Sequence, residues 1–178
     1  MNKIIHQIWV GPEVMQVRER RCSRLIKSKN PSWEYMFWND ENVPKLPEKM
    51  QEVYDFFGQT KQYTFQADVL RLFLVREYGG LYLDVDFEPH NSFDDFETMD
   101  NLFLTWGVNQ ERMMNGAFGA NIGDKAIISL CDKVDMNTRF YGPDWFANSL
   151  KDQDVNKMTF DDFLKKYAYH HHLASWIK

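Results

Sequence analysis

The fold of this chain is decided by its middle, which reads ADVLR at residues 67–71 and YGGLYLDVD at residues 78–86. From Phe65 onward, apolar residues recur at spacings of three and four, which predicts a helix with one apolar face and a charged edge. Gly79 and Gly80 then end this helix, because glycine readily adopts the left-handed conformation that a helix C-terminus commonly needs. The following LYLDVD predicts a strand that finishes in two carboxylates.

The two carboxylates are predicted to emerge side by side. Alternate side chains of a strand share a face, which groups Asp84 and Asp86 with Tyr82 and leaves the aliphatic residues on the other face. Like charges this close raise each other's pKa unless a proton or a divalent cation lies between them. A buried strand that ends in acids is typical of an α/β active site, whereas two surface aspartates at a solvated strand end are the alternative interpretation.

The preceding residues predict a βαβ unit with a parallel sheet. Residues 3–10 and 33–38 read as strands on either side of a charged helix over residues 14–29. The inner face of that helix is expected to hold Val17, Leu25, Ile26 and either Arg21 or Cys22.

The later residues predict further elements. After Asp86 the chain is expected to leave the strand, because Pro89 cannot donate to a ladder. Residues 114–120 are rich in small side chains, which lets the backbone approach a ligand closely. The remaining elements are a helix over 45–58, a strand over 102–106, a helix capped by Asp124 that runs to about residue 134, and helices over 142–150 and 160–166.

Composition describes an ordinary folded protein. The 178 residues suffice for one domain with a sizeable core, and none of them reads as a linker. The net charge of −5 argues against a protein that holds nucleic acid on a broad basic surface. Cys22 and Cys131 cannot build a disulfide framework and fit a reducing compartment. With no signal-like segment and no run of ~20 apolar residues, we expect a soluble, cytoplasmic protein without a membrane span.

Three further features each allow two interpretations. His6, inside the first predicted strand, reads as a core or near-site histidine in preference to a metal ligand. Trp9, at the carboxyl end of that strand, is either a core residue or a ring that stacks on a nucleotide base. The consecutive histidines 170–172 form either a surface run or the source of one neutral imidazole for a metal held by the two aspartates.

Several motifs occur in an order that resembles the DXD glycosyltransferases of the GT-A fold, in particular the family 32 sugar transferases. A more distant likeness is to the catalytic domains of large clostridial glucosylating toxins. The motifs are IIHQIW at 4–9 with Gly11 and Pro12, NPSWEY at 30–35, ADVLR at 67–71, GGLYLDVD at 79–86, NGAFGA at 115–120, and YAYH at 167–170 with Ser175 and Trp176. The resemblance implies an α/β fold, a single Rossmann-like GT-A domain over residues 1–178 with a mixed, mostly parallel central sheet flanked by helices.

The resemblance also implies roles for individual residues. The expected catalytic residues are Asp68, Arg71, Asp84 and Asp86. The expected ligands of a Mn²⁺ or Mg²⁺ ion are Asp86, Asp84 and His170, although relatives carry tryptophan in place of His172, which leaves all three histidines open as ligands. The expected contacts with the donor nucleotide are Ile8, Trp9, Val10, Asp68, Arg71, Tyr82, Asp84, Val85, Asn115, Ser175 and Trp176.

The implied function is a metal-dependent transfer of a hexose, with retention, from a nucleotide-sugar to a glycan or another hydroxyl acceptor. UDP-glucose or UDP-galactose is the favoured donor by likeness to the toxins, and GDP-mannose is the alternative. The residue types suit this chemistry, because aspartate oxygens and an imidazole bind Mn²⁺, and the cation together with Arg71 offsets the charge of a departing diphosphate.

Two other functions compete with this one. An aspartate-nucleophile phosphatase also places Asp-x-Asp after a hydrophobic strand, but near the start of its fold and before a small β-branched residue, whereas Phe87, Glu88 and Pro89 follow here. A non-catalytic or partner-dependent sugar-nucleotide binding domain is the other alternative, because the chain is short for the fold. A calcium loop of the EF-hand type is excluded by the missing glycine and closing glutamate.

Overall fold

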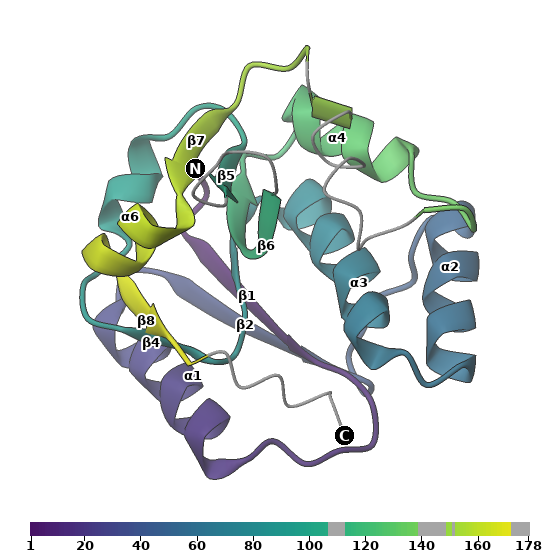
Figure 1. Cartoon of the computed structure of the whole chain (residues 1–178), viewed down its shortest axis with the longest axis horizontal. Coiled ribbons are helices and arrows are strands. Elements are labelled where there is room, and N and C mark those ends of the chain that lie inside the picture. Colours follow the sequence, from purple (N-terminus) through teal and green to yellow (C-terminus); the bar gives the residue numbers. More distant parts are fainter. Residues whose placement is uncertain (107–112, 139–148, 151, 172–178) are drawn as a thin grey trace.

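The computed structural model describes residues 1–106, 113–138, 149–150 and 152–171 (Figure 1). Its elements, in chain order, are β1 (Ile4–Trp9), α1 (Val17–Lys29), β2 (Glu34–Asn39), α2 (Glu48–Gln59), α3 (Tyr63–Tyr78), β3 (Gly80–Leu83), β4 (Phe87–Pro89), the 3-10 helix η1 (Asp94–Thr98), β5 (Phe103–Trp106), β6 (Met113–Ala120), α4 (Lys125–Asp132), β7 (Asn156–Thr159), α6 (Phe160–Lys166) and β8 (Ala168–His170). The helix predicted over residues 142–150 lies almost wholly outside the described residues.

A mixed, mostly parallel sheet forms the centre of the molecule, as predicted. Its strand order is β2-β1-β3-β6-β5-β7, and β6 runs antiparallel to both of its neighbours. The predicted βαβ unit is confirmed, because β1 and β2 pair in parallel over their full length. A second, two-stranded sheet joins β4 to β8 in antiparallel register. Within the described part of the chain, no helix is both long and apolar enough to cross a membrane.

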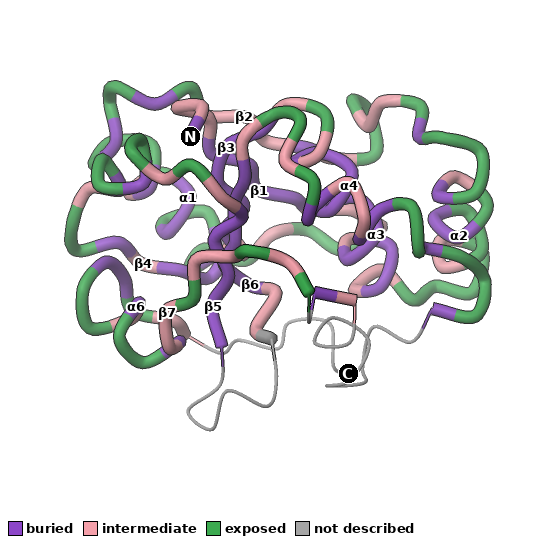
Figure 2. The backbone as a smooth tube through the Cα atoms, turned by 90° about the horizontal axis from the view of Figure 1, so that it is seen from above, coloured by how far each residue is buried: buried purple, intermediate pink, exposed green. Residues whose placement is uncertain are grey.

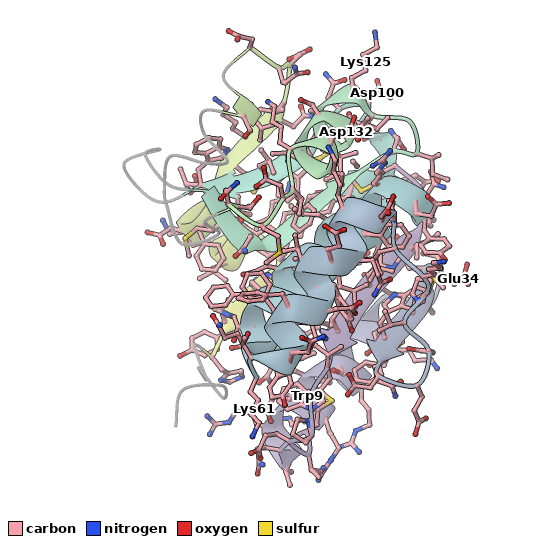
Figure 3. All side chains as sticks on the ribbon, turned by 90° about the vertical axis from the view of Figure 1, so that its right-hand side faces the viewer. Trp9, Glu34, Lys61, Asp100, Lys125 and Asp132 are labelled. Carbon is pink, nitrogen blue, oxygen red and sulfur yellow. The ribbon has the colours of Figure 1, made fainter. Side chains whose placement is uncertain are left out.

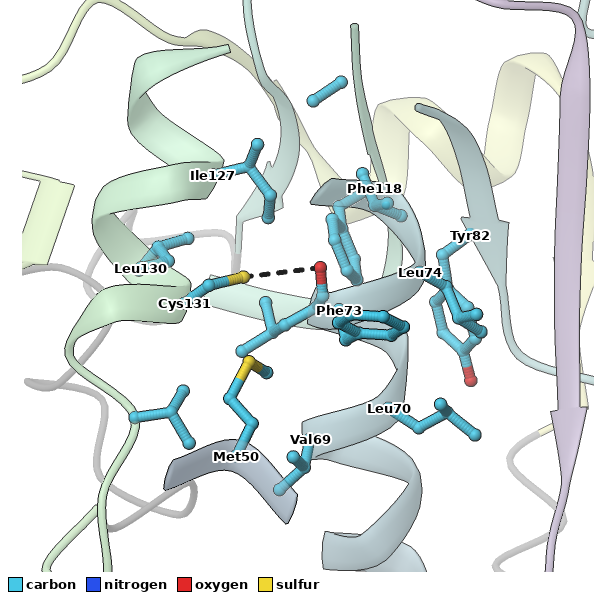
Figure 4. Close-up of a cluster of buried hydrophobic side chains, with 14 of the residues drawn as sticks. Met50, Val69, Leu70, Phe73, Leu74, Tyr82, Phe118, Ile127, Leu130 and Cys131 are labelled. Carbon is cyan, nitrogen blue, oxygen red and sulfur yellow. Dashed lines mark hydrogen bonds between the residues drawn. The ribbon is translucent and has the colours of Figure 1, made fainter. Parts of the chain in front are cut away.

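Helices cover both faces of the sheet, and strand alternation divides the core between them (Figure 1). Tyr82 and Phe118 pack on the face that α2, α3 and α4 cover, where Figure 4 shows them beside α3. Leu81 and Leu83 pack on the opposite face, in a cluster with the aromatic residues of η1 and α6. The central strands are therefore buried on both sides, as the run of buried residues in Figure 2 shows.

Helix α3 is buried on nearly every side, and the prediction of one apolar face with a charged edge is wrong. All residues from Phe65 to Val75 except Ala67 are buried, including Asp68 and Arg71. The reason is that α3 packs against α2 and α4 as well as against the sheet. The predicted stop is confirmed, since Gly79 follows the helix with φ 67° and its N–H donates to the carbonyl of Val75.

The inner face of α1 differs from the prediction at its start. Cys22 and Ile26 are buried as expected, but Val17 is 70% exposed and Glu19 only 1%. The buried residues 19, 22, 23 and 26 follow helical spacing. Val17 is two residues before Glu19, which rotates its side chain about 200° away from that face, so the packing register decides which residue is buried.

The strand that carries the acids is shorter than predicted. It ends at Leu83, opposite Ala117 of β6, and residues 84–87 form a turn closed by the Phe87 N–H and the Asp84 carbonyl at 3.3 Å. The expectation that alternation sets both carboxylates on one strand face is therefore wrong for Asp86. The chain leaves the strand as predicted, but residues 87–89 enter a new ladder, in which Pro89 occupies the last position opposite Ala168.

Candidate functional site

Two acids and one histidine converge at the end of β3. Ligand atoms of Asp84, Asp86 and His170 all lie within 4.8 Å of one another. His170 Nε2 lies 3.0 Å from Asp86 Oδ1, and both side chains are largely buried. Two segments supply this group, because Asp84 and Asp86 lie in the turn that follows β3 and His170 ends β8. The side-by-side arrangement predicted for the carboxylates is thus produced by a turn.

The pairing of β4 with β8 positions His170. Phe87 is the register partner of His170, and the two rings stack with centroids 4.5 Å apart. The edge of the Phe160 ring also contacts the imidazole, at 5.5 Å between centroids. The next N–H, from His171, donates to the Asp86 carbonyl at 3.2 Å. Aromatic packing and one backbone hydrogen bond therefore hold the imidazole against the acid turn.

Helix α3 supplies a buried ion pair on the other side of the acids. Arg71 Nη2 lies 3.2 Å from Asp68 Oδ1, and Arg71 Nη1 lies 3.3 Å from Asp84 Oδ1. Asn115 of β6 completes the group, since its side-chain amide donates to Asp68 at 2.7 Å and its carbonyl accepts from Arg71 at 2.8 Å. The guanidinium is fixed on both edges, which makes it a rigid positive charge beside Asp84.

Tyr82 supports Asp84 from behind. Its hydroxyl donates to Asp84 Oδ1 at 2.7 Å, and the Arg71 guanidinium lies over its ring at 4.5 Å from the centroid. The ring is only 2% exposed. The ring therefore acts on the site through Asp84 and Arg71, and the contact of Tyr82 with a nucleotide, by its backbone or its ring, stays a prediction.

Two supporting residues were not singled out from the sequence. The Gln7 amide donates to the Asp84 carbonyl at 3.1 Å and its own carbonyl accepts from the Tyr35 hydroxyl at 2.7 Å. Gly116 accepts from the Asp84 N–H at 2.8 Å, and a Cβ at position 116 would lie 2.7 Å from Asp84 Oδ2. The sequence signal that could have identified Gln7 is a polar residue inside a predicted strand that is otherwise largely apolar. The small residues at 114–120 do allow a close approach of the backbone, as predicted. The group that the backbone of Gly116 approaches is the Asp84 carboxylate.

Burial and crowding shift the titration of the acids. Burial raises the pKa of Asp68 to about 6, which Arg71 opposes and Asp84 reinforces. Burial also raises the pKa of Asp84, against the opposing charge of Arg71. Two carboxylates and one imidazole within a few ångströms are a donor set that fits a hard divalent cation such as Mn²⁺ or Mg²⁺. Asp84, Asp86 and His170 are the residues that could hold it.

The residues predicted near the end of β1 take different positions. Ile8 is buried in the core beside α3, and Val10 packs against that core. Trp9 is half-buried, and its indole N–H donates to the Glu13 carbonyl at 2.5 Å. Figure 3 shows Trp9 at the same end of the molecule as Lys61 and far from Lys125. Val85 is half-buried in the turn between the two acids.

The histidines separate into three environments. His6 is fully buried, its Nε2 donates to the Gly79 carbonyl at 2.8 Å and its Nδ1 accepts from Trp38, so the prediction of a core histidine is confirmed. Burial lowers the pKa of His6 to about 4, which keeps it neutral. His171 faces Glu88, at 2.9 Å, while His170 faces Asp86. His172, Ser175 and Trp176 lie outside the described residues.

Residues 16–103 match the family described as "Glycosyltransferase sugar-binding region containing DXD motif". The matched part contains both acids of the turn and the ion pair of α3. His170 lies beyond it, and Trp9 lies before it.

Curated relatives carry related names. Inositol phosphoceramide mannosyltransferase 3 of Schizosaccharomyces pombe is 33% identical over 99 residues, which are 52% of this chain and 26% of that protein. An uncharacterized glycosyltransferase of Acanthamoeba polyphaga mimivirus is 27% identical over 122 residues, which are 66% of this chain and 49% of that protein. The chain thus spans about a quarter of the yeast relative and about half of the viral one.

The fold is similar to that of a solved glycosyltransferase. The PaToxG glycosyltransferase superposes with a TM-score of 0.70 at 18% sequence identity, over 84% of this chain and 68% of that one. This likeness confirms the α/β glycosyltransferase fold that the motifs imply. The chain thus combines this fold with a match of residues 16–103 to the sugar-binding regions of glycosyltransferases that contain a DXD motif.

Proposed function

We propose that the described residues form one glycosyltransferase domain, which transfers a hexose from a nucleotide-sugar to a hydroxyl group of a glycan or another acceptor. One observation carries the proposal: Asp84 and Asp86, which lie in the DXD-containing region, converge with His170 within 4.8 Å, next to a buried arginine. A diphosphate is a ligand that suits this arrangement, because its negatively charged oxygens can bind a cation and a guanidinium at the same time.

Asp86, His170 and Asp84 would hold the divalent cation. When bound, this cation supplies positive charge to the diphosphate that leaves the sugar. Asp84 Oδ1 already accepts from Tyr82 and lies beside Arg71, so its second oxygen, which faces Gly116, is the one that we assign to the cation or to the donor. Arg71 adds a positive charge whose side chain does not have to move when the donor binds, because Asp68 and Asn115 hold it in place.

Two arguments concern the identity of the donor sugar, and they favour different donors. The likeness of the motifs favours UDP-glucose or UDP-galactose, with Trp9 as the ring beneath the base. The Schizosaccharomyces pombe relative is named a mannosyltransferase, which favours a mannosyl donor. We therefore propose a nucleotide-hexose, with GDP-mannose tested beside the two UDP-sugars, and retention at the anomeric carbon by family likeness.

A binding domain without catalysis is the second candidate. The matched part spans only about a quarter of the yeast relatives, so most residues of those proteins have no counterpart in it. Such a domain would bind a nucleotide-sugar in the presence of a cation and leave it intact.

The test measures binding and turnover of UDP-glucose, UDP-galactose and GDP-mannose with Mn²⁺, by calorimetry and by release of the nucleoside diphosphate. We expect one donor to bind and to turn over, and Asp86→Asn to lower kcat/KM by at least ~10²-fold. The control is Asp100→Asn, an exposed aspartate at the other end of the molecule from Trp9 (Figure 3), which should change nothing.

The other outcomes decide between the candidates. Binding without turnover, lost in Asp86→Asn, supports the binding domain. Phosphate release from a generic aryl phosphate would support the phosphatase. The absence of any donor binding, with Asp86→Asn equal to the wild type, contradicts the proposal.

A further inference from the structure

A second group of potential metal ligands lies beside the acid turn. Cys22 Sγ, a carboxylate oxygen of Glu88 and a ring nitrogen of His171 all lie within 4.8 Å of one another. Three elements meet here, because Cys22 belongs to α1, Glu88 to β4, and His171 follows β8. Helix α1 packs against β4, and Figure 1 shows α1, β4 and β8 together.

The chemistry of this group differs from that of the first. Asp84, Asp86 and His170 offer two hard oxygens and one nitrogen, whereas this group offers a sulfur, a nitrogen and an oxygen. Sulfur and imidazole ligands are those of Zn²⁺, which binds Cys at about 2.3 Å and His or a carboxylate at about 2.0–2.2 Å. A spread of 4.8 Å can be closed around such an ion by small movements of the side chains.

We propose that Cys22, Glu88 and His171 form a second metal site, selective for Zn²⁺ or a similar thiolate-binding ion, with its fourth position open to water. Cys22 is fully buried, and Glu88 and His171 are half-buried, so the ion would sit at the edge of the α1–β4 packing. Arg21 already holds the other oxygen of Glu88, at 3.1 Å, which orients the carboxylate.

Binding at this site has a defined proton balance. Burial, together with Glu88 and Asp86, raises the pKa of Cys22 to about 11, so without the ion the thiol is protonated at neutral pH. Formation of the metal–sulfur bond releases that proton to solvent. The 2.9 Å contact between His171 Nε2 and Glu88 Oε2 is given up in the same step. The neutral imidazole then carries its hydrogen on Nδ1, exchanged through solvent, and the Nε2 lone pair binds the ion.

The site would fix the end of the chain that carries His170. His171 follows His170 directly, and its N–H also donates to the Asp86 carbonyl. An ion that ties His171 to α1 therefore clamps β8 onto β4 and holds His170 opposite Asp86.

The test titrates metal-stripped protein with Co²⁺, a coloured substitute for Zn²⁺, under reducing conditions. A thiolate bound to Co²⁺ gives a charge-transfer absorption, which the oxygen-and-nitrogen site at Asp86 cannot give. We expect this absorption in the wild type and in Asp86→Asn, and its loss in Cys22→Ser. The matched control is Cys131→Ser, the other buried cysteine, whose sulfur donates to the Leu72 carbonyl at 3.5 Å (Figure 4) and which should keep the absorption.

His171→Gln and Glu88→Gln keep the test decisive if Cys22→Ser fails to fold. Both side chains are half-buried, and each change should weaken Co²⁺ binding at the thiolate by at least ~10-fold. Zn²⁺ should raise the Tm of Asp86→Asn but not that of Asp86→Asn combined with His171→Gln. The proposal is overturned if the wild type shows no thiolate absorption, if folded Cys22→Ser keeps that absorption, or if His171→Gln and Glu88→Gln bind Co²⁺ at the thiolate as tightly as the wild type.

Discussion

The two sides of the candidate site are built differently. On the α3 side, Asp68, Arg71 and Tyr82 are almost fully buried. Arg71 pairs with Asp68 and with Asp84, and the Tyr82 hydroxyl donates to Asp84. On the β8 side, the imidazole of His170 meets Asp86 through one short strand pair and aromatic stacking. The first side is part of the core that stabilises the protein, whereas the second side offers cation ligands at the edge of that core.

This contrast gives the two sides different expected responses to mutation. A change on the α3 side should lower the free energy of unfolding, because it leaves a buried charge without its partner. A change on the β8 side should mainly weaken cation binding. The following experiments test whether the two sides differ in this way.

The largest effect is expected for Arg71→Ala, which leaves the buried Asp68 carboxylate and the neighbouring Asp84 uncompensated. The free energy of unfolding should fall by about 3–5 kcal/mol, measured by denaturant unfolding. Arg76→Ala, on the same helix, is the control, because its ion pair with Asp132 is largely exposed and should contribute at most about 1 kcal/mol. Equal losses in the two variants would mean that the α3 side is not a charge-compensated core.

The pH dependence of stability should report Asp68. Its pKa is raised to about 6 in the folded protein, above the ordinary value of 3.8, so between these values the folded state holds a proton that the unfolded state has lost. Stability should therefore fall as pH rises from about 4 to 6 and stay level above, by an amount on the order of 3 kcal/mol from this group.

Asp68→Asn isolates this contribution. The amide cannot titrate and still accepts from Asn115 or Arg71, so the difference in unfolding free energy between wild type and variant should change between pH 4 and pH 6 and not above. A difference that is constant across this range would show that burial does not control the Asp68 carboxyl.

The smallest effect on folding is expected on the β8 side. His170→Ala should weaken Mn²⁺ binding by at least ~10-fold in calorimetry, while the free energy of unfolding changes by less than in Arg71→Ala. The control is His90→Ala, an exposed histidine that bonds to the Lys165 carbonyl at 3.0 Å and should leave Mn²⁺ binding unchanged. Unaltered Mn²⁺ affinity in His170→Ala would remove this histidine from the cation site.

Local signals predicted much of the fold. Gly79 marks where α3 stops, and the order of strand, helix and strand over the first forty residues predicts the parallel pair of β1 and β2. The convergence of Asp84 with Arg71 also follows locally, because Tyr82 and Asp84 share the strand face that α3 covers.

Contacts between distant residues could not be predicted in the same way. The ladder between β3 and β6 ends at the pair Leu83 and Ala117. The type of residue at Val85, which favours a strand, does not indicate that the strand has already ended. Pro89 argued against a strand, yet the last position of a short edge ladder tolerates it. Glu88 and His171 are 83 residues apart in the sequence, yet their side chains are in contact. The need for glycine at position 116 becomes visible only in the structure, where β6 lies beside Asp84.

The pairing of β4 with β8 also orders events during synthesis. Asp86 leaves the ribosome well before His170, and at about 5–20 residues per second the interval between them is on the order of ten seconds. During that time β1, β2, β3 and α3 are complete, while β4 has no partner and the Phe87 ring has no imidazole to cover it. The α3 ion pair and Asp84 are therefore synthesised first, and the cation site is complete only after His170 has followed.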